Sequence, residues 1–273
     1  MSNGPAPNNA PDDALGARWL DALTGSAAPL TGYPASVRVV DSEIDGRAAR
    51  FIAVVPDPDS RFPRARNGEV GLAEGWGLAR AVREAIAADA EAETRRAIVA
   101  VVDVPSQAYG RTEEAYGIHQ ALAAAAEAYA QARRAGHPVI GLIVGRAMSG
   151  GFLAHGYQAN RLIALSGAAV QVHAMGKQAA ARITQRSVEG VEALAKTITP
   201  MAYDIESYAS LGLLYQQLDV AADDTNQADT VRTALGQALA DIGDGRALSD
   251  RFAAAGRPAS TEVRRRLREQ WAG

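Results

Sequence analysis

Two short turns in this sequence carry residue types that suit the binding of an anion, or of an oxygen that becomes negative during a reaction. They are residues 101–110 (VVDVPSQAYG) and residues 143–151 (IVGRAMSGG). Each follows an apolar run and precedes a pattern typical of a helix. Backbone N–H groups at the start of a helix lack intrahelical partners, and the helix dipole reinforces their attraction for negative charge. Each turn therefore predicts a group of free donors where a strand gives way to a helix.

Two such turns suit a carbonyl oxygen that becomes negative during a reaction, as it does when an enolate forms from a thioester. Converging donors would form an oxyanion hole, in which the loss of one donor typically costs about 3 kcal/mol of transition-state stabilisation. The candidate catalytic residues are Ser106, Gln107, Ser149, Gly150 and Gly151. The candidate substrate-binding residues are Gly110, Met148 and His173. Simpler interpretations stay open, because glycines also permit tight helix packing and serines also cap helices.

A nucleophilic mechanism is the main rival on the same residues. Ser149 within GRAMSGG, followed by His173, resembles the nucleophile and base positions of Clp-type serine peptidases. Such a site needs an acid that orients the imidazole, and the sequence around residues 211–224 gives no clear support for Asp219 in that role. The four histidines are scattered without the spacing of a helical metal site, so no metal is predicted.

The elements that must position the two turns follow from the hydrophobic pattern. Strands are predicted at residues 37–40, 49–55, 96–104, 137–144, 161–165 and 169–173. The first two flank Asp45-Gly46, which is a strong hairpin signal. Helices are predicted at residues 15–23, 72–90, 113–136, 150–158 and 176–183, and from residue 189 onward, with a basic final helix around residues 264–268. The alternation of strands and helices indicates the α/β class, and the first helix is a candidate clamp onto a partner.

Composition narrows the remaining classes of function. The 273 residues are 48% hydrophobic and 22% charged, which is typical of a globular protein with a sizeable core. The formal net charge of −3 and the lack of a reading motif argue against a nucleic-acid partner. The absence of cysteine excludes disulfides and thiolate sites and fits a cytoplasmic location. No stretch reaches the roughly 20 apolar residues of a membrane span. Residues 1–14 are expected to form a disordered tail.

Four blocks of the sequence resemble carboxyltransferase domains of the crotonase superfamily, and they occur in the order of that family. They are DGRAARFIAVVPD, VVDVPSQAYGRTEEAYG, GRAMSGGFLAHG and VHAMGKQAAARI, which begin at residues 45, 101, 145 and 172. Within the superfamily, AMSGGFLAHG, QANRLIAL, VHAMGK and PMAYDIESYASLGLL, in residues 147–214, most resemble the γ subunit of malonate decarboxylase. The resemblance covers roughly residues 15–218, and its strength lies in the order and spacing of the blocks.

The helical pattern at the end of the sequence predicts a C-terminal extension in residues 219–273 that packs on the domain or on a partner. The resemblance implies a crotonase-like fold of repeated β-β-α units in residues 15–218. It also implies that one chain is half of an enzyme. With a β subunit of related fold, the chain would convert malonyl thioester on an acyl carrier protein into acetyl thioester and carbon dioxide. The carrier arm of the family is phosphoribosyl-dephospho-CoA, and an acyl transferase subunit completes the complex.

The resemblance further implies that this chain binds no biotin. In biotin-dependent relatives a Gly-Phe pair stands where this sequence has Ser106 and Gln107, and an amide of that pair helps to hold the ureido oxygen of carboxybiotin. The departure fits a loss of biotin handling. The alternatives are a subunit of a biotin-dependent decarboxylase or carboxylase, a Clp-like peptidase that uses Ser149 and His173, and a non-catalytic scaffold subunit.

Overall fold

A seven-stranded, mostly parallel sheet organises the computed structural model, which describes residues 14–243, 246, 248 and 258–272. The order of the strands is β1-β2-β3-β4-β5-β7, and β6 pairs with β4 beyond the end of β5. The strands are β1 (Val37–Ile44), β2 (Arg47–Val54), β3 (Ala97–Val104), β4 (Val139–Met148), β5 (Arg161–Ser166), β6 (Gln171–His173) and β7 (Gln216–Ala221). Among the strand pairs of the described residues, only β1–β2 is antiparallel, so the α/β prediction is confirmed.

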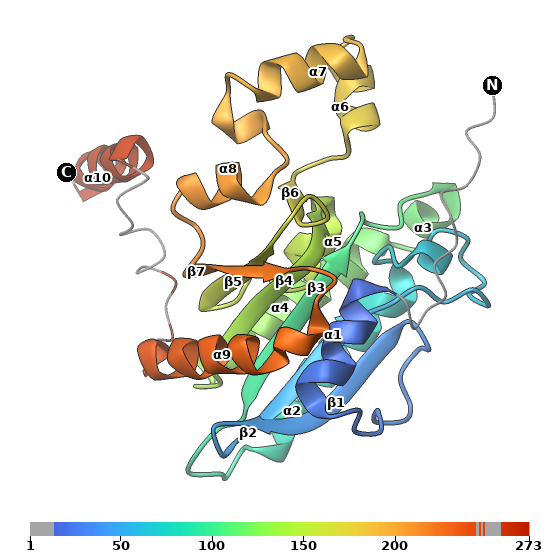
Figure 1. The fold of residues 1–273 in the computed structure, drawn as a ribbon, viewed down its shortest axis with the longest axis vertical. Helices are drawn as coiled ribbons and strands as arrows, with labels where there is room; N and C mark the ends of the chain where they lie inside the picture. The colour runs from blue at the N-terminus through green and yellow to red at the C-terminus, as the bar shows by residue number, and fades with distance from the viewer. Residues whose placement is uncertain (1–13, 244–245, 247, 249–257, 273) are drawn as a thin grey trace.

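Helices cover both faces of the sheet (Figure 1). The helices α1 and α9 pack on one face, and α2 and α4 pack against each other on the other face. The helices are α1 (Leu15–Thr24), α2 (Leu72–Ala88), α3 (Arg111–Ala115), α4 (Ile118–Arg134), α5 (Ser149–Ala154), α6 (Lys177–Ile183), α7 (Val188–Ala195), α8 (Ile205–Ser210), α9 (Ala228–Ile242) and α10 (Pro258–Ala272). Within the described residues, no helix combines the length and apolarity needed to cross a membrane.

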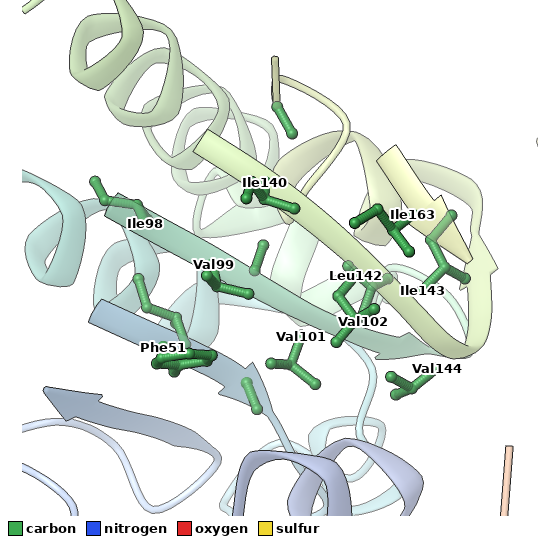
Figure 2. Packing of buried hydrophobic residues seen from close by; sticks show 14 of the residues in the cluster. Phe51, Ile98, Val99, Val101, Val102, Ile140, Leu142, Ile143, Val144 and Ile163 are labelled. Carbon is green, nitrogen blue, oxygen red and sulfur yellow. The ribbon is translucent and has the colours of Figure 1, made fainter. Parts of the chain in front are cut away.

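The central strands form the core because both of their faces are covered. Figure 2 shows side chains of β3 and β4, including Val101, Leu142 and Ile143, packed together with Phe51 of β2. Burying one such side chain typically contributes about 1.5–3 kcal/mol. This packing fixes the carboxyl ends of β3 and β4, where the two turns begin.

Local signals place the β1–β2 hairpin as predicted. Asp45 and Gly46 both adopt the left-handed region, with φ of 49° and 75°. Two consecutive residues of positive φ match the type I′ turn, whose twist suits a two-residue hairpin. The hairpin supplies β2, the strand that pairs with β3.

Several predicted elements differ from the structure, among them the helix expected at residues 150–158, which ends at Ala154. The single helix expected at residues 113–136 is interrupted at Gly117, whose φ of 81° is left-handed and separates α3 from α4. The strand β4 extends to Met148 rather than ending at Val144, because β6 pairs with its last residues. The region after residue 189 is not wholly helical, since β7 adds a strand beside β5. The boundary expected between residues 218 and 219 falls inside β7.

The N-terminal helix belongs to the core of its own chain. Trp19, Leu20 and Leu23 of α1 are completely buried, and the Trp19 indole N–H donates to the carbonyl oxygen of Ala222 at 2.7 Å. The apolar face of α1 is thus used internally, so the interpretation of this helix as a clamp onto a partner is wrong. At the opposite end of the chain, α10 stands apart from the sheet (Figure 1).

Candidate functional site at the ends of β3 and β4

The two turns identified in the sequence touch each other, because β3 and β4 are parallel neighbours that end at one edge of the sheet. A methyl group added to Gly151 would lie 2.6 Å from the carbonyl oxygen of Ser106. One added to Gly150 would collide with the side-chain oxygen of Gln107. Both glycines therefore serve close packing, as one of the two interpretations predicted. The same contact brings the backbone of Ser106 and Gln107 against the start of α5.

Backbone donors of both turns remain free. Within the described part of the chain, the N–H groups of Ser106, Gln107, Gly150 and Gly151 donate to no protein carbonyl. For Gly150 and Gly151 the cause is their place in the first turn of α5, where no preceding helical carbonyl exists. The site thus presents unpaired donors from two adjoining segments, which is the arrangement that an oxyanion needs.

The first turn is held in place by Val70. The Val70 N–H donates to the carbonyl oxygen of Ser106 at 3.1 Å, and the Ala108 N–H donates to the carbonyl oxygen of Val70 at 2.8 Å. These two bonds fix the peptide planes on both sides of Gln107. No local pattern in the sequence predicts this contact, because residue 70 is distant in the chain and lies in an irregular segment.

Neither serine caps a helix. The helix α3 begins after Gly110 and α5 begins after Met148, and neither N-cap residue accepts a side-chain hydrogen bond. The capping interpretation of Ser106 and Ser149 is therefore wrong. Both side chains are half-buried at the carboxyl edge of the sheet.

Ser149 has a strained backbone. Its φ of 59° lies in the left-handed region, which costs a residue with a Cβ atom roughly 1–2 kcal/mol. The strain arises where an extended strand turns directly into a helix, since Met148 is extended and Ser149 is the first residue of α5. Strain of this kind is found most often at functional sites, because the surrounding structure must maintain it.

A mostly apolar cavity of about 320 Å³ opens beside the second turn. Its lining includes Ser149, Gly150, Phe152, Leu153, Tyr157, Val172, His173, Ala174, Thr199, Pro200, Ala202, Tyr208 and Leu211. The structure therefore brings together Ser149, Gly150 and His173. Gly110 instead lines a separate cavity of about 760 Å³ with Trp76. Met148 is buried in a small cluster with Tyr203.

His173 lies next to the second turn, because β6 pairs with β4 and sets His173 opposite Met148. Its Nδ1 atom is 2.9 Å from the carbonyl oxygen of Met175 and 3.1 Å from the Met175 amide nitrogen. Its ring stacks on Tyr203 with 4.0 Å between centroids. Burial lowers the pKa of His173, and the hydrogen bond with Met175 opposes that shift. A neutral imidazole at the cavity wall is the expected state near pH 7.

The arrangement does not form a peptidase triad. The Nδ1 atom of His173, which a triad turns toward a carboxylate, is engaged by Met175 instead. Asp219, the acid that the sequence offered, is exposed on β7. Ser149 and His173 share a cavity without the third group that would orient the base.

Two acidic residues that the sequence analysis did not single out support the turns. The Asp103 carboxylate accepts from the Arg146 backbone N–H at 3.0 Å and joins the ends of β3 and β4. Glu69 precedes Val70 and pairs with Arg64 at 2.6 Å. Burial raises the pKa of Glu69, while the Arg64 charge opposes the shift. Both residues are acids within or beside an apolar run, and this position was the signal by which they could have been identified from the sequence.

No described group of three or more His, Asp or Glu side chains is arranged to hold a metal ion. The free donors of the site are backbone amides, which bind anions rather than cations. The residues present therefore suit a negatively charged or polarised oxygen.

Comparison with known proteins gives the arrangement a family. The family model described as malonate decarboxylase gamma subunit matches residues 65–271. A Pseudomonas malonate decarboxylase hetero-tetramer, crystallised in complex with coenzyme A, contains a chain 65% identical to this one, with a TM-score of 0.91. That match covers 94% of this chain and 100% of the other. The chain of a Pseudomonas MdcD–MdcE hetero-dimer is 62% identical, with a TM-score of 0.87, and the match covers 94% and 99% of the two chains.

More distant relatives share the fold. The malonyl-S-ACP:biotin-protein carboxyltransferase of Malonomonas rubra is 38% identical over 157 residues, which are 56% of this chain and 54% of that protein. The chain thus spans about half the length of this curated relative. The transcarboxylase 12S subunit is 19% identical with a TM-score of 0.61, over 82% of this chain and 41% of that one, and shows the crotonase-like fold alone. With the family model covering most of its length, the chain belongs to the malonate decarboxylase gamma subunit family.

Proposed function

We propose that this chain works with a β subunit to decarboxylate malonyl thioester carried on an acyl carrier protein. The observation that carries the proposal is the junction of the two turns, where free amides of Ser106, Gln107, Gly150 and Gly151 adjoin at one edge of the sheet. The high identity to subunits of the Pseudomonas malonate decarboxylase complexes supports it. These amides suit an enolate, whose oxygen gains the charge released by loss of carbon dioxide.

The proposed reaction has two steps. The bond between C2 of the malonyl group and its carboxylate carbon breaks, carbon dioxide leaves, and the electron pair of that bond forms the thioester enolate. A proton then adds to C2 and gives the acetyl thioester. Backbone amides of the turns stabilise the enolate oxygen in the first step. The side chains of Ser106, Gln107 and Ser149 are candidates to bind the departing carboxylate or to relay the proton. His173 lines the same cavity as Ser149.

The proposed partners follow the family. The Pseudomonas relatives form a hetero-dimer and hetero-tetramers, which supports a β subunit that completes the site of this chain. The carrier arm of the acyl carrier protein would be phosphoribosyl-dephospho-CoA, and an acyl transferase subunit would load it. This chain would itself hold neither a metal nor biotin.

A biotin-dependent variant of the reaction is the second candidate. The Malonomonas relative is described as a carboxyltransferase from malonyl-S-ACP to a biotin protein. In that reaction the carboxyl group passes to biotin before it is released, whereas the proposed reaction releases carbon dioxide directly. The two candidates differ in their need for biotin.

The test is release of carbon dioxide from malonyl thioester by this chain alone, by its β partner alone and by the mixture, without biotin. Activity in the mixture only is expected, because each chain supplies part of the site. Activity that appears only after a biotin protein is added would support the second candidate. No activity in any sample, together with labelling of Ser149 by a fluorophosphonate, would favour the peptidase interpretation.

A further inference from the structure

His155 is completely buried. Each of its two ring nitrogens forms a hydrogen bond with another secondary-structure element. Its Nε2 atom is 3.0 Å from the carbonyl oxygen of Val101, which is labelled in Figure 2. Its Nδ1 atom is 3.0 Å from the hydroxyl oxygen of Tyr129. Val101 belongs to β3 and Tyr129 to α4, so the imidazole connects a strand of the sheet to a helix that covers it.

The direction of both hydrogen bonds follows from the partners. A carbonyl oxygen can only accept, so Nε2 must carry the ring proton and donate to Val101. Nδ1 is then unprotonated and accepts from the Tyr129 hydroxyl. Burial lowers the pKa of His155 to about 4, so the ring is neutral at neutral pH and keeps this arrangement. No charge is buried and every polar atom of the ring is satisfied.

The position of His155 relates it to the second turn. Its backbone N–H donates to the carbonyl oxygen of Gly151 at 3.0 Å and ends α5. The helix α5 has only 6 residues, which is too short for it to be stable without tertiary contacts. Gly151 sits against Ser106, so a small rotation of α5 would separate the donors of the two turns. The His155 side chain is an anchor that opposes such a rotation from the far end of the helix.

We infer that His155 is a positioning residue, which holds α5 against β3 so that the amides of Gly150 and Gly151 stay aligned with those of Ser106 and Gln107. The inference rests on the proposed function for its catalytic consequence. Donors that act mainly on the enolate affect the rate of the chemical step more than substrate binding. Loss of the anchor should therefore lower kcat and leave KM nearly unchanged.

The structure provides a matched control in His137. This histidine is also buried and also bonds a β3-side carbonyl, with Nδ1 3.0 Å from the carbonyl oxygen of Arg96. It lies at the start of β4, at the end of the strand pair opposite to the turns. A substitution there disturbs a buried imidazole without touching α5.

The experiment compares His155→Phe, His155→Gln, Tyr129→Phe and His137→Phe in the assembled complex with the β subunit. His155→Phe is expected to lower kcat about 10- to 100-fold with KM within threefold of the wild type. His155→Gln keeps a donor and an acceptor and should recover most of the loss, while Tyr129→Phe should fall between. His137→Phe should keep the wild-type kcat. A folded His155→Phe complex with wild-type kcat, or a His137→Phe complex with an equal loss, would overturn the inference.

A second readout is independent of activity. Amide hydrogen exchange of a peptide covering α5 reports the bond from the His155 N–H to Gly151. At least tenfold faster exchange is expected in His155→Phe and in Tyr129→Phe, but not in His137→Phe. If the wild-type complex is inactive, the proposed function fails while this measurement still decides the anchor. If His155→Phe does not fold, Tyr129→Phe becomes the decisive variant. Unchanged exchange and unchanged kcat in Tyr129→Phe would then contradict the inference that His155 positions α5.

Discussion

The two ends of the β3–β4 strand pair differ in how fully their polar groups are satisfied. At the start of the strands, Asp89 accepts from the Arg96 backbone N–H at 2.8 Å and from its guanidinium at 2.7 and 3.0 Å, and the Arg96 carbonyl oxygen bonds His137. At the carboxyl ends, the turn amides donate to no described carbonyl and Ser149 is strained. The start of the strands is stabilised by a carboxylate–guanidinium cluster, although the His137 Nε2 atom there is buried without a partner. The carboxyl ends are joined by the Asp103 carboxylate and still keep unpaired backbone donors for a ligand.

The largest effect on kcat is expected from Gly151→Ala, at the carboxyl ends of β3 and β4. The new methyl group would lie 2.6 Å from the carbonyl oxygen of Ser106, so the two turns must separate. Loss of an aligned donor costs about 3 kcal/mol of transition-state stabilisation, which predicts a fall in kcat of about 100-fold. Steady-state kinetics of the complex checks this.

The control for that variant is Gly176→Ala. A methyl group on Gly176 meets no described atom within 4 Å, and its φ of −63° suits any residue. It should keep the wild-type kcat. If Gly151→Ala also keeps it, the contact between the two turns has no part in catalysis.

A smaller effect, on stability alone, is expected from Asp89→Asn, at the start of β3 and β4. The Arg96 hydrogen bond lowers the pKa of Asp89, so its carboxylate stabilises the fold at neutral pH. We expect the free energy of unfolding in urea to fall by about 2 kcal/mol at pH 7, with kcat unchanged. The difference in stability should vanish as the pH falls through the lowered pKa of Asp89. The wild-type carboxyl group is then protonated and therefore uncharged, as the asparagine amide of the variant is at every pH.

Glu127→Gln is a suitable comparison for that variant. The pair of Glu127 with Arg83 is exposed, with 58% and 43% of the two side chains accessible to solvent. Exposed pairs typically contribute less than about 1 kcal/mol. Equal losses in the two variants would contradict the idea that the buried cluster carries the polar stabilisation.

The smallest effect is expected from Ser149→Gly, which relieves the backbone strain at the start of α5. Glycine adopts a φ of 59° without cost, so the free energy of unfolding should rise by about 1 kcal/mol. Ser149→Ala keeps the Cβ atom and should give no gain. Urea unfolding of the isolated chain measures both. A destabilised Ser149→Gly would mean that the hydroxyl, rather than the backbone, dominates at this position.

The sequence predicted those parts of the fold that depend on local or strongly apolar signals. The β1–β2 hairpin follows from Asp45-Gly46, and β3 from a run in which nearly every residue is buried. The strand β7 gave no such signal, because only Leu218 and Val220 of its six residues are buried at the edge of the sheet. The break at Gly117 was hidden by the helical pattern on both sides of it.

The site was predicted in the same uneven way. The turns and their free amides follow from a strand-to-helix junction, which is local. The left-handed backbone conformation of Ser149 depends on how α5 meets the neighbouring turn. No residue type in the sequence predicts it. Asp103 was missed, and the partner of His155 could not be identified, because Arg146 and Val101 lie 43 and 54 residues away in the chain. Such contacts exist only once the sheet has formed.

The bond from Trp19 to Ala222 has a consequence for the synthesis of the protein. The two residues are 203 positions apart, so at typical translation speeds roughly 10 to 40 s pass between their emergence from the ribosome. During that interval the Trp19 indole lacks the carbonyl oxygen that finally accepts from it, although α1 can already contact β1 to β4, which are synthesised earlier. The polar contact that ties the first helix to the last third of the chain therefore forms only when synthesis is nearly complete.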